Sequence, residues 1–377
     1  MRQGTLRGAV LLLAAVLTVC GTGATPAVWG QSADQTAPAA VAQSVTQSLS
    51  RVLTSGRQPE SFVMVTPKMG YLLTTANTLW STTDGGRQWK RVRAFPWVLT
   101  LTATNHQIWV QTPRRLWVRT QGGEHWASRP LPRGDAQAAQ FNPAQVGFVN
   151  RRDGWVVTTQ GMAAGAETIQ LWATRTGGRA WAGVSTQGLP YQGSKAFAFR
   201  TPQDGWMFGM DALRPGVVQF FQTHSGGVQW SPDSLTLPAT FRHRYILFTG
   251  LHQAGHTDGI LVVATPDSND LVSWTIYHQT AAGSWQHGAI QTVPAANQNP
   301  TITWRGATAW VVNGSQLWRG KDWGRRWQLI QQWAQPVEKK PIVALTWTGI
   351  RRSVGYAIVG QELFVSRNQG TQWVHAQ

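Results

Sequence analysis

Apolar and polar positions follow one pattern seven times along the chain. In each copy a short run of alternating or continuous apolar residues meets a polar turn rich in glycine, and the chain resumes at a bulky aromatic residue. Residues 79–89 (LWSTTDGGRQW) form the first copy, which closes at Trp89. Apolar runs on both sides of such a turn are typical of a β-hairpin. The later copies close at Trp126, Trp181, Trp230, Trp285, Trp327 and Trp373.

The polar turn of each copy has a regular chemistry. Five residues before the closing tryptophan stands a hydrogen-bonding side chain, such as Asp84, Asp322 or Asn368, and side chains of this kind accept hydrogen bonds from turn N–H groups. Three residues before it there is usually a glycine, which adopts positive φ without strain. These glycines are Gly86, Gly123, Gly178, Gly227, Gly324 and Gly370. We predict a structural role for all of these residues.

The spacing of the copies predicts the fold. Consecutive closing tryptophans are 37, 55, 49, 55, 42 and 46 residues apart, close to the period of about 40–50 residues that is typical of four-stranded propeller blades. In the first copy the apolar runs predict four consecutive strands near residues 62–65, 71–75, 78–82 and 89–93. One such sheet cannot bury both its faces alone, so neighbouring sheets must cover each other. The predicted fold is all-β, a seven-bladed β-propeller over residues 60–377.

The repeated turn resembles the Asp-box, or bacterial neuraminidase repeat, of the form Ser/Thr-x-Asp-x-Gly-x-x-Trp. Thr82, Asp84, Gly86 and Trp89 match it in full. Together with the phrases VGFVNRRDGWVV and AFAFRTPQDGWMFG in the third and fourth repeats, the chain resembles the photosystem II stability/assembly-factor-like propellers, which share the sialidase-like architecture. The resemblance implies a non-enzymatic assembly scaffold whose boxes lie far from the ligand face. Nothing in the sequence indicates photosynthesis, so that role is not carried over.

The first 27 residues have the pattern of a signal peptide. Two arginines precede an apolar run of 11 residues at 9–19, which is too short to span a bilayer comfortably. Cys20 is the only cysteine and follows this run, so the segment also resembles a lipoprotein attachment site. Lipid anchoring at Cys20 and cleavage further along the chain both remain open. We expect an extracytoplasmic protein, either secreted or anchored to the outer face of the bacterial cytoplasmic membrane.

Residues 28–59 are rich in alanine, glutamine, serine and threonine and show little apolar periodicity. This composition predicts a flexible linker between the export signal and the propeller. The chain has 33 lysines and arginines against 16 aspartates and glutamates, a formal net charge of +17. An anionic cell-envelope polymer is one partner that this charge suggests, and an acidic working environment is the other explanation. Export makes nucleic acid an unexpected partner.

Loop positions suggest where a partner binds. If the glycine-containing turn joins the third and fourth strands of a blade, then the loops between its second and third strands, and those between blades, lie on the opposite face. The longer repeats place their extra residues there, and functional loops on a rigid scaffold usually cluster on one face. Ordinary solvated loops are the alternative. The polar candidates on this face are Arg133, Asp135, Glu167, Asp211, Arg214, Arg242, His243 and Arg244.

Catalytic chemistry has weaker support. A glycosidase needs convergent carboxylates, and the sequence does not exclude that Asp135, Glu167 and Asp211 meet across blades. His252, His256 and Asp258 have a metal-like spacing but fall in a predicted turn, so we predict no metal site. No nucleotide or cofactor motif is present. We therefore favour a monomeric, non-enzymatic scaffold for a protein or an anionic envelope partner, with a secreted sialidase-like glycosidase or glycan-binding propeller as the alternative.

Overall fold

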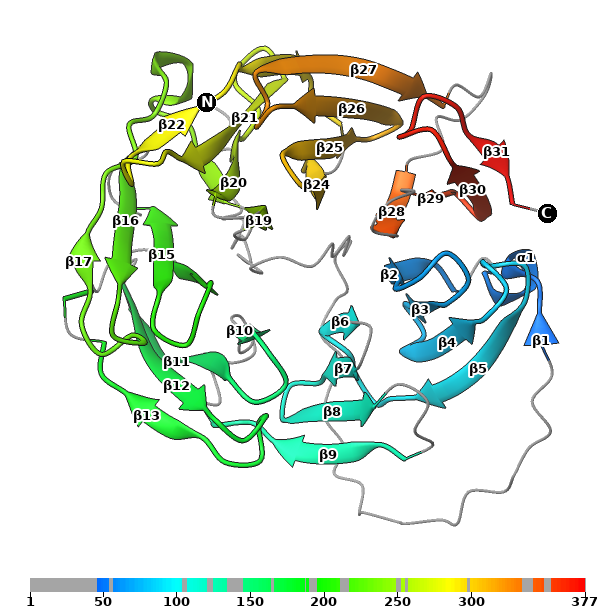
Figure 1. Ribbon diagram of the computed structural model, residues 1–377, viewed down its shortest axis with the longest axis horizontal. Coiled ribbons are helices and arrows are strands. Elements are labelled where there is room, and N and C mark those ends of the chain that lie inside the picture. The colour runs from blue at the N-terminus through cyan, green and yellow to red at the C-terminus, as the bar shows by residue number, and fades with distance from the viewer. Residues whose placement is uncertain are drawn as a thin grey trace, which may run out of the picture. The chain divides into compact units, whose positions relative to one another are not determined.

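The computed structural model describes fourteen stretches of the chain: residues 46–53, 57–103, 107–120, 125–133, 145–163, 166–186, 188–189, 195–210, 217–248, 252–254, 257–296, 299–333, 342–348 and 354–376. Nearly all of its regular structure is antiparallel β-sheet, and the strands group into seven sheets (Figure 1). The predicted fold class, an all-β seven-bladed β-propeller, is confirmed. The chain divides into two compact units, one with blades two to six within Trp97–Ile342 and one with blades one and seven. No helix among the described residues is long and apolar enough to cross a membrane.

The first unit contains five sheets, and in four of them strands consecutive in sequence are neighbours. Blade five differs by two short additions, β19 beside β20 and β23 beside β21. The elements of blades two to four are β6 (Thr100–Ala103), β7 (Gln107–Gln111), β8 (Arg115–Thr120), β9 (Ala127–Pro130), β10 (Gln145–Phe148), β11 (Gly154–Ala163), β12 (Ala166–Thr174), β13 (Ala182–Val184), β14 (Lys195–Phe199), β15 (Gly205–Met210), β16 (Val218–Thr223) and β17 (Ser231–Pro232). Those of blades five and six are η1 (Ala239–Phe241), β18 (Ile246–Phe248), β19 (His252–Ala254), β20 (Thr257–Ala264), β21 (Leu271–Gln279), β22 (Trp285–His287), β23 (Gln291–Pro294), β24 (Thr301–Arg305), β25 (Thr308–Asn313), β26 (Gln316–Lys321) and β27 (Arg326–Gln332).

Side chains between neighbouring sheets form the core of this unit. The middle strands are apolar on both faces, as the buried runs of β7, β20 and β25 show, because each sheet is covered on both sides. Between blades three and four the rings of Trp155 and Phe199 stack in parallel with their centroids 3.9 Å apart. Between blades four and five Trp206 meets Trp285 edge to face at 6.1 Å. Aromatic packing of this kind supplies much of the apolar area that a disulfide-free blade needs.

The second unit contains blades one and seven, which share one apolar core. Its elements are β1 (Thr46–Gln47), α1 (Leu49–Val52), β2 (Pro59–Met64), β3 (Gly70–Thr74), β4 (Thr78–Thr82), β5 (Trp89–Ala94), β28 (Ile342–Thr348), β29 (Val354–Val359), β30 (Glu362–Ser366) and β31 (Val374–His375). The hydroxyl of Tyr356 in β29 donates a hydrogen bond of 2.6 Å to the carbonyl of Pro67 in blade one. Blades one and seven therefore pack directly, and each has its own four consecutive strands.

Residues 46–53 differ from the flexible linker that the sequence predicts for this stretch. β1 pairs with β5 as a fifth strand of blade one. Leu49, Val52 and Leu53 are buried in the core that blades one and seven share, with exposed fractions of 6%, 0% and 0%. Three apolar residues among serines and glutamines give no clear periodicity, so the pairing of β1 with β5 and the burial of these residues could not be predicted from the sequence. The export signal and the rest of the linker, residues 1–45 and 54–56, lie outside the described residues.

Candidate binding surfaces

The turn between the third and fourth strands of a blade, here called the closing turn, is built on hydrogen bonds in blade one. The Thr82 hydroxyl accepts the Gly86 N–H at 2.9 Å and donates to the Asp84 carboxylate at 2.8 Å. The carboxylate accepts the N–H of Gln88 at 3.0 Å, and the indole of Trp89 donates to the Gly86 carbonyl at 2.9 Å. The Thr82 hydroxyl, the Asp84 carboxylate and the Trp89 indole therefore each have a partner within the turn, and Trp89 is completely buried.

Three further closing turns repeat this geometry with other side chains. The leading hydroxyl accepts the glycine N–H four residues on, from Thr174 to Gly178 at 2.9 Å, Thr223 to Gly227 at 3.0 Å and Ser366 to Gly370 at 2.8 Å. The side chain at the position of Asp84 accepts the N–H four residues on, which gives Thr176 with Ala180, Ser225 with Gln229 and Asn368 with Gln372, each at 2.9 Å. A hydroxyl or an amide oxygen thus replaces the carboxylate, because the turn needs only an acceptor at this position.

The glycine of the closing turn also permits close packing between blades. In blade one, Gly86 has φ +93°, and a Cβ atom there would lie 2.3 Å from Leu363 of blade seven. In blade four, Gly227 has the same φ, and its Cβ would lie 2.4 Å from Leu171 of blade three. Both the positive φ and the close approach require glycine. The closing turns of blades one and four therefore contribute to packing between blades.

The closing turns of blades two, five and six depart from this geometry. Gly123 lies outside the described residues, while Trp126 is half-buried with the Arg119 guanidinium 5.9 Å from its ring centroid. In blade five Trp285 donates instead to the Asp233 carboxylate at 3.1 Å. In blade six the turn is held by aromatic packing of Trp323. The signature is thus strictest where a hydroxyl residue stands seven positions before the closing tryptophan.

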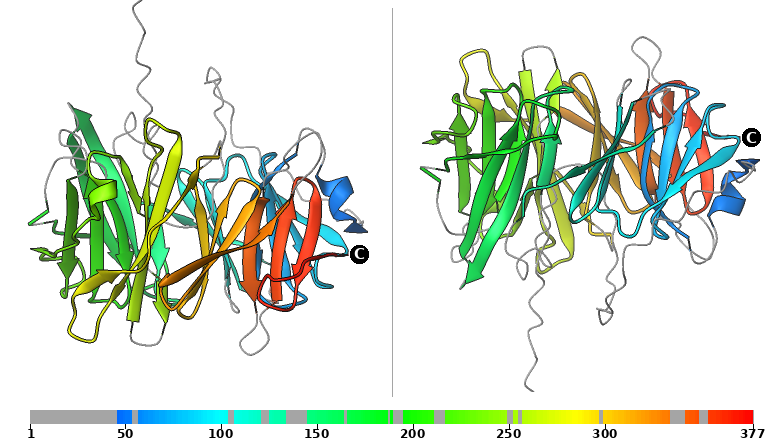
Figure 2. Two further views of the ribbon diagram at one scale, coloured as in Figure 1. Left: turned by 90° about the horizontal axis from the view of Figure 1, so that it is seen from above. Right: turned by 90° about the horizontal axis from the view of Figure 1, so that it is seen from below.

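The strands of each blade run between two opposite ends (Figure 2), and hydrogen bonds in blade five place the closing turn and the loop before β18 at different ends. In blade five, β21 runs into the closing turn at Gln279, which pairs with Trp285, while Gly259 near the start of β20 pairs with His278. At the other end of β20, the Thr265 N–H donates to the Tyr245 carbonyl at 2.9 Å. The loop before β18 is therefore on the face that the sequence analysis favours.

The candidate residues on that face fall into three groups. Asp135, Asp211 and Arg214 lie outside the described residues, and Glu167 is the second residue of β12. Arg133 is exposed in the segment after β9. Arg242, His243 and Arg244 follow η1 directly and are described together with Tyr245. We call these four residues the 242–245 loop.

Arg244 fixes the 242–245 loop to the loop between β20 and β21. Its guanidinium donates to the Thr265 carbonyl at 2.7 Å and to the Ser273 hydroxyl at 3.2 Å, and it also reaches the carbonyls of Ala264 and Leu271. Burial lowers the pKa of Arg244, while the nearby Asp267 carboxylate opposes that shift. Arg244 is one of the predicted binding residues, and with its donors used in this way it positions the loop.

The other three residues of the loop point their side chains into solvent. Arg242 and His243 are exposed, and the phenol of Tyr245 has an exposed fraction of 55%. His243 has φ +63°, an uncommon backbone conformation for a residue with a Cβ. No hydrogen bond or ion pair involves these three side chains within the described part of the chain. Tyr245 was not among the residues predicted from the sequence. The sequence nevertheless contained a signal, because this aromatic residue follows basic residues and precedes an apolar strand.

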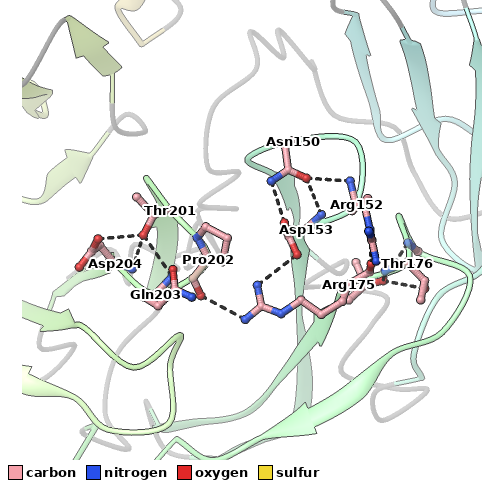
Figure 3. Close-up of polar contacts among 11 residues, drawn as sticks. Asn150, Arg152, Asp153, Arg175, Thr176, Thr201, Pro202, Gln203 and Asp204 are labelled. Atoms are coloured by element: carbon pink, nitrogen blue, oxygen red, sulfur yellow. Dashed lines mark hydrogen bonds and ion pairs between the residues drawn. The ribbon is translucent and has the colours of Figure 1, made fainter.

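A polar network fastens the opposite end of blades three and four (Figure 3). The Asp153 carboxylate accepts hydrogen bonds from Asn150 at 2.7 Å and from Arg175 at 3.1 Å. Arg175 also reaches the Pro202 carbonyl of blade four at 3.5 Å. The hydrogen bond from Asn150, followed by that from Arg175, holds the pKa of Asp153 below its usual range. The network ties the turn between strands one and two to the closing turn.

Blade four repeats this arrangement with a histidine. His224 Nδ1 lies 2.8 Å from the Asp204 carboxylate, which also accepts the Thr201 hydroxyl at 2.8 Å. Burial acts to raise the pKa of Asp204, but hydrogen bonds from His224 and Thr201 outweigh it and the pKa is lowered. An open hollow of about 480 Å³ lies beside this closing turn and is lined in part by His224 and Trp230. Neither of these two Asp–basic pairs, Asp153 with Arg175 and Asp204 with His224, was predicted from the sequence.

Asp258 has an interblade role. It is completely buried and pairs with Arg200 of blade four at 2.9 Å. Burial raises the pKa of Asp258, and the Arg200 charge opposes this shift. Its sequence neighbour His256 lies outside the described residues. Within the described part of the chain, no three histidine, cysteine, aspartate or glutamate side chains come together to form a metal site.

Comparison with known proteins identifies the class by its fold. No protein-family model matches the chain, and no curated protein does. A YCF48–D1 peptide complex is 14% identical, with a TM-score of 0.50 over 87% of this chain and 96% of that chain. YCF48 from Cyanidioschyzon merolae is 16% identical, with a TM-score of 0.50 over 85% and 97%.

The extracellular domain of the putative one-component system BT4673 from B. thetaiotaomicron is another similar structure. It is 8% identical, with a TM-score of 0.52 over 83% of this chain and 39% of that chain. The structural neighbours of this chain thus include YCF48, a photosystem II assembly-factor-like propeller, and the fold is a seven-bladed β-propeller. At these identities the likeness establishes the fold.

Proposed function

We propose that this protein is an exported, non-enzymatic propeller scaffold that binds a polypeptide segment of a cell-envelope partner through the 242–245 loop. The observation that supports the proposal is that the residues of this loop have two different roles. Arg244 fixes the backbone through several acceptors, while Arg242, His243 and Tyr245 remain exposed. A loop that is already held in one conformation loses less entropy when it binds.

The chemistry of the exposed side chains suits a polypeptide partner. Tyrosine and arginine are enriched among the residues that dominate protein–protein binding energy. Tyr245 offers an aromatic surface with a polar end, and Arg242 can hold a carboxylate through two parallel hydrogen bonds. Together with the formal net charge of +17, this favours a partner segment that contains acidic and apolar residues. The complex of YCF48 with a D1 peptide supports peptide binding as a use of this fold.

Export is part of the proposal and rests on the amino-terminal pattern of the sequence. A signal peptide at residues 1–27 and the cysteine at position 20 support a location outside the cytoplasm, with or without a lipid anchor. Metabolic labelling with a palmitate analogue in the wild type and in Cys20→Ala separates the anchored form from the released one. Incorporation that is lost in the variant indicates anchoring, and none in either protein indicates release.

The scaffold proposal is tested by affinity purification of envelope extract on the immobilised full-length chain. Arg242→Ser, His243→Ser and Tyr245→Ser are combined in one variant that leaves Arg244 in place. The expected result is one dominant polypeptide that the wild type retains and the variant loses by about tenfold or more, since each lost anchor is worth about 1 kcal/mol or more.

The matched control alters the other face. Arg151→Ser, Arg152→Ser and Val228→Ser change three exposed residues near the closing turns of blades three and four, and this control should retain the partner. Equal retention by all three proteins would contradict the proposal. So would turnover of chromogenic glycosides that is abolished by Glu167→Gln, because that result indicates a glycosidase.

A further inference from the structure

The outer strands of the blades differ in length and in what covers them. Four blades end in short pieces, because β9 has four residues, β13 three, β17 two and β31 two. Blade five ends in β22 and β23, with three and four residues. Pro130, Pro232 and Pro294 lie in these strands, and proline removes a ladder donor from a sheet edge. Such edges offer little for another strand to pair with.

Blades one and six end in long outer strands instead. β5 has six residues and β27 has seven. In blade one β1 covers the edge, with Thr46 opposite Lys90 and Gln47 opposite Trp89. β27 is the last strand of its sheet. It is the only outer strand of more than four residues in the described part of the chain that no further strand covers.

The two long strands share one irregularity. In β5 the pairing with β4 shifts by one residue at Val92, and in β27 the pairing with β26 shifts at Ile330. Both positions are three residues after the closing tryptophan. A bulge often protects an edge from pairing, but in blade one β1 pairs with the two residues at Trp89 and Lys90, before the bulge. The equivalent two residues of blade six are Trp327 and Gln328.

The two closing tryptophans also differ in burial. Trp89, beside β1 and α1, is completely buried. Trp327 is only half-buried, although its indole donates to the Ala289 carbonyl at 3.0 Å. Leu329, two residues on, has an exposed fraction of 38%. Blade six therefore exposes apolar surface at Trp327 and Leu329, whereas in blade one Trp89 shares a buried core with the apolar residues of α1.

The charge around this edge is positive. Lys321, Arg325 and Arg326 are exposed in and beside the closing turn of blade six, where Asp322 is the one acidic residue. An extended peptide gains affinity from main-chain hydrogen bonds when it adds to a sheet edge, and its side chains give specificity. Opposite charge steers the encounter and selects the partner.

We infer that the outer edge of blade six binds an extended acidic polypeptide segment as an added strand, in the register that β1 has on β5. Aliphatic residues that follow the strand would then pack beside Trp327, as Leu49 and Leu53 join the buried core that contains Trp89. This site goes beyond the proposed function, because it uses a different recognition mode and different residues from the 242–245 loop. The two sites therefore respond to different variants.

The test is hydrogen exchange of the full-length chain with a designed peptide, Glu-Thr-Glu-Thr-Gln-Ser-Leu-Ser-Glu-Val-Leu with blocked ends. It copies residues 46–53 with glutamate in place of Arg51 and adds three residues in front. At a peptide concentration ten times the dissociation constant, amides of residues 326–332 should exchange about tenfold more slowly. A peptide N-methylated in its first five residues should give no protection, since it cannot form the ladder. Lysine in place of each glutamate should also weaken binding.

Matched variants test the charge. Arg325 and Arg179 both stand two residues before a closing tryptophan, but Arg179 precedes the three-residue strand β13. Arg325→Glu should weaken the peptide about fivefold, and Arg179→Glu should leave binding unchanged. Absence of protection in residues 326–332, or equal protection by the N-methylated peptide, would overturn the inference. Protection at the 242–245 loop alone would also overturn it, yet would support the proposed function.

Discussion

Blades one and six reach the same hairpin by different chemistry. In blade one a hydroxyl, a carboxylate and an indole satisfy the turn. In blade six Gly320 stands where Thr82 stands in blade one, and a Cβ atom there would lie 2.8 Å from the Trp327 ring. No hydroxyl residue fits at that position. Three successive residues of this turn, Asp322, Trp323 and Gly324, have φ of 51°, 58° and 77°.

Aromatic packing replaces the missing hydroxyl in blade six. Trp323 lies nearly parallel to His278 of blade five, with ring centroids 5.9 Å apart, and a Cβ atom at Gly259 would meet its ring at 2.2 Å. Positive φ costs about 1 kcal/mol or more for a residue with a Cβ, and the buried indole surface offsets this cost. The comparison teaches that the repeat requires a hairpin with an inward-facing indole, while the means of holding the turn can vary.

The largest expected effect separates the two closing tryptophans. Trp89→Ala removes a completely buried indole and should lower the free energy of unfolding by about 3–5 kcal/mol. Trp327→Ala removes a half-buried indole and should cost about 1–2 kcal/mol. Urea titration monitored by circular dichroism measures both. Equal losses would show that the exposed surface of Trp327 is covered in solution even without a partner. We expect such cover only when a peptide is bound to blade six.

The cover over blade one should have the next largest effect. Leu53→Ala leaves a cavity in the core that blades one and seven share and should cost about 2–4 kcal/mol. Arg51 in the same helical turn is exposed, so Arg51→Ala should change stability by less than about 0.5 kcal/mol. Thermal unfolding of the two variants measures the difference. An unchanged midpoint for Leu53→Ala would mean that residues 46–53 do not contribute to the core.

The hydroxyl of the closing turn should have a smaller effect. Thr82→Ala removes the acceptor of the Gly86 N–H, which is buried, and should cost about 1–2 kcal/mol. Thr82→Ser keeps the hydroxyl and should recover most of this loss. Thr223→Ala in blade four should resemble Thr82→Ala, because Thr223 makes the same bond. Urea titration measures the free energy of unfolding of all three variants. An equal loss in Thr82→Ser and Thr82→Ala would contradict this role of the hydroxyl.

The smallest effect concerns pH and belongs to blade one. Burial raises the pKa of Glu60 from 4.5 to about 7, so the folded protein keeps this carboxyl protonated at a pH where the unfolded chain ionises it. Stability contributed by the group is therefore present below about pH 4.5 and is lost as pH rises through about 7. Glu60→Gln should raise the thermal midpoint at pH 8 by about 2 °C and leave it unchanged at pH 4. A uniform shift at both pH values would contradict this cause.

The sequence predicted what the repeats determine locally. Seven indole-closed hairpins, four strands to a blade and the face of the closing turns all follow from spacing and turn chemistry. The role of Arg244 did not, because its acceptors are backbone carbonyls 20–27 residues away. The pairing of β1 with β5 also could not be predicted, since edge pairing depends on main-chain atoms. The sequence did contain a signal for the Asp153–Arg175 pair. Asp153 stands directly before a glycine and a tryptophan, and Arg175 directly follows the hydroxyl residue that ends strand three of its blade.

We expect the face opposite the closing turns to contact the partner. A photo-crosslinking amino acid at Tyr245 is compared with one at Val228, which lies in the closing turn of blade four and has a similar exposed fraction of 48% against 55%. With the polypeptide retained in the affinity experiment, the account predicts a crosslinked product from position 245 and none from position 228. A product from position 228 alone would contradict it.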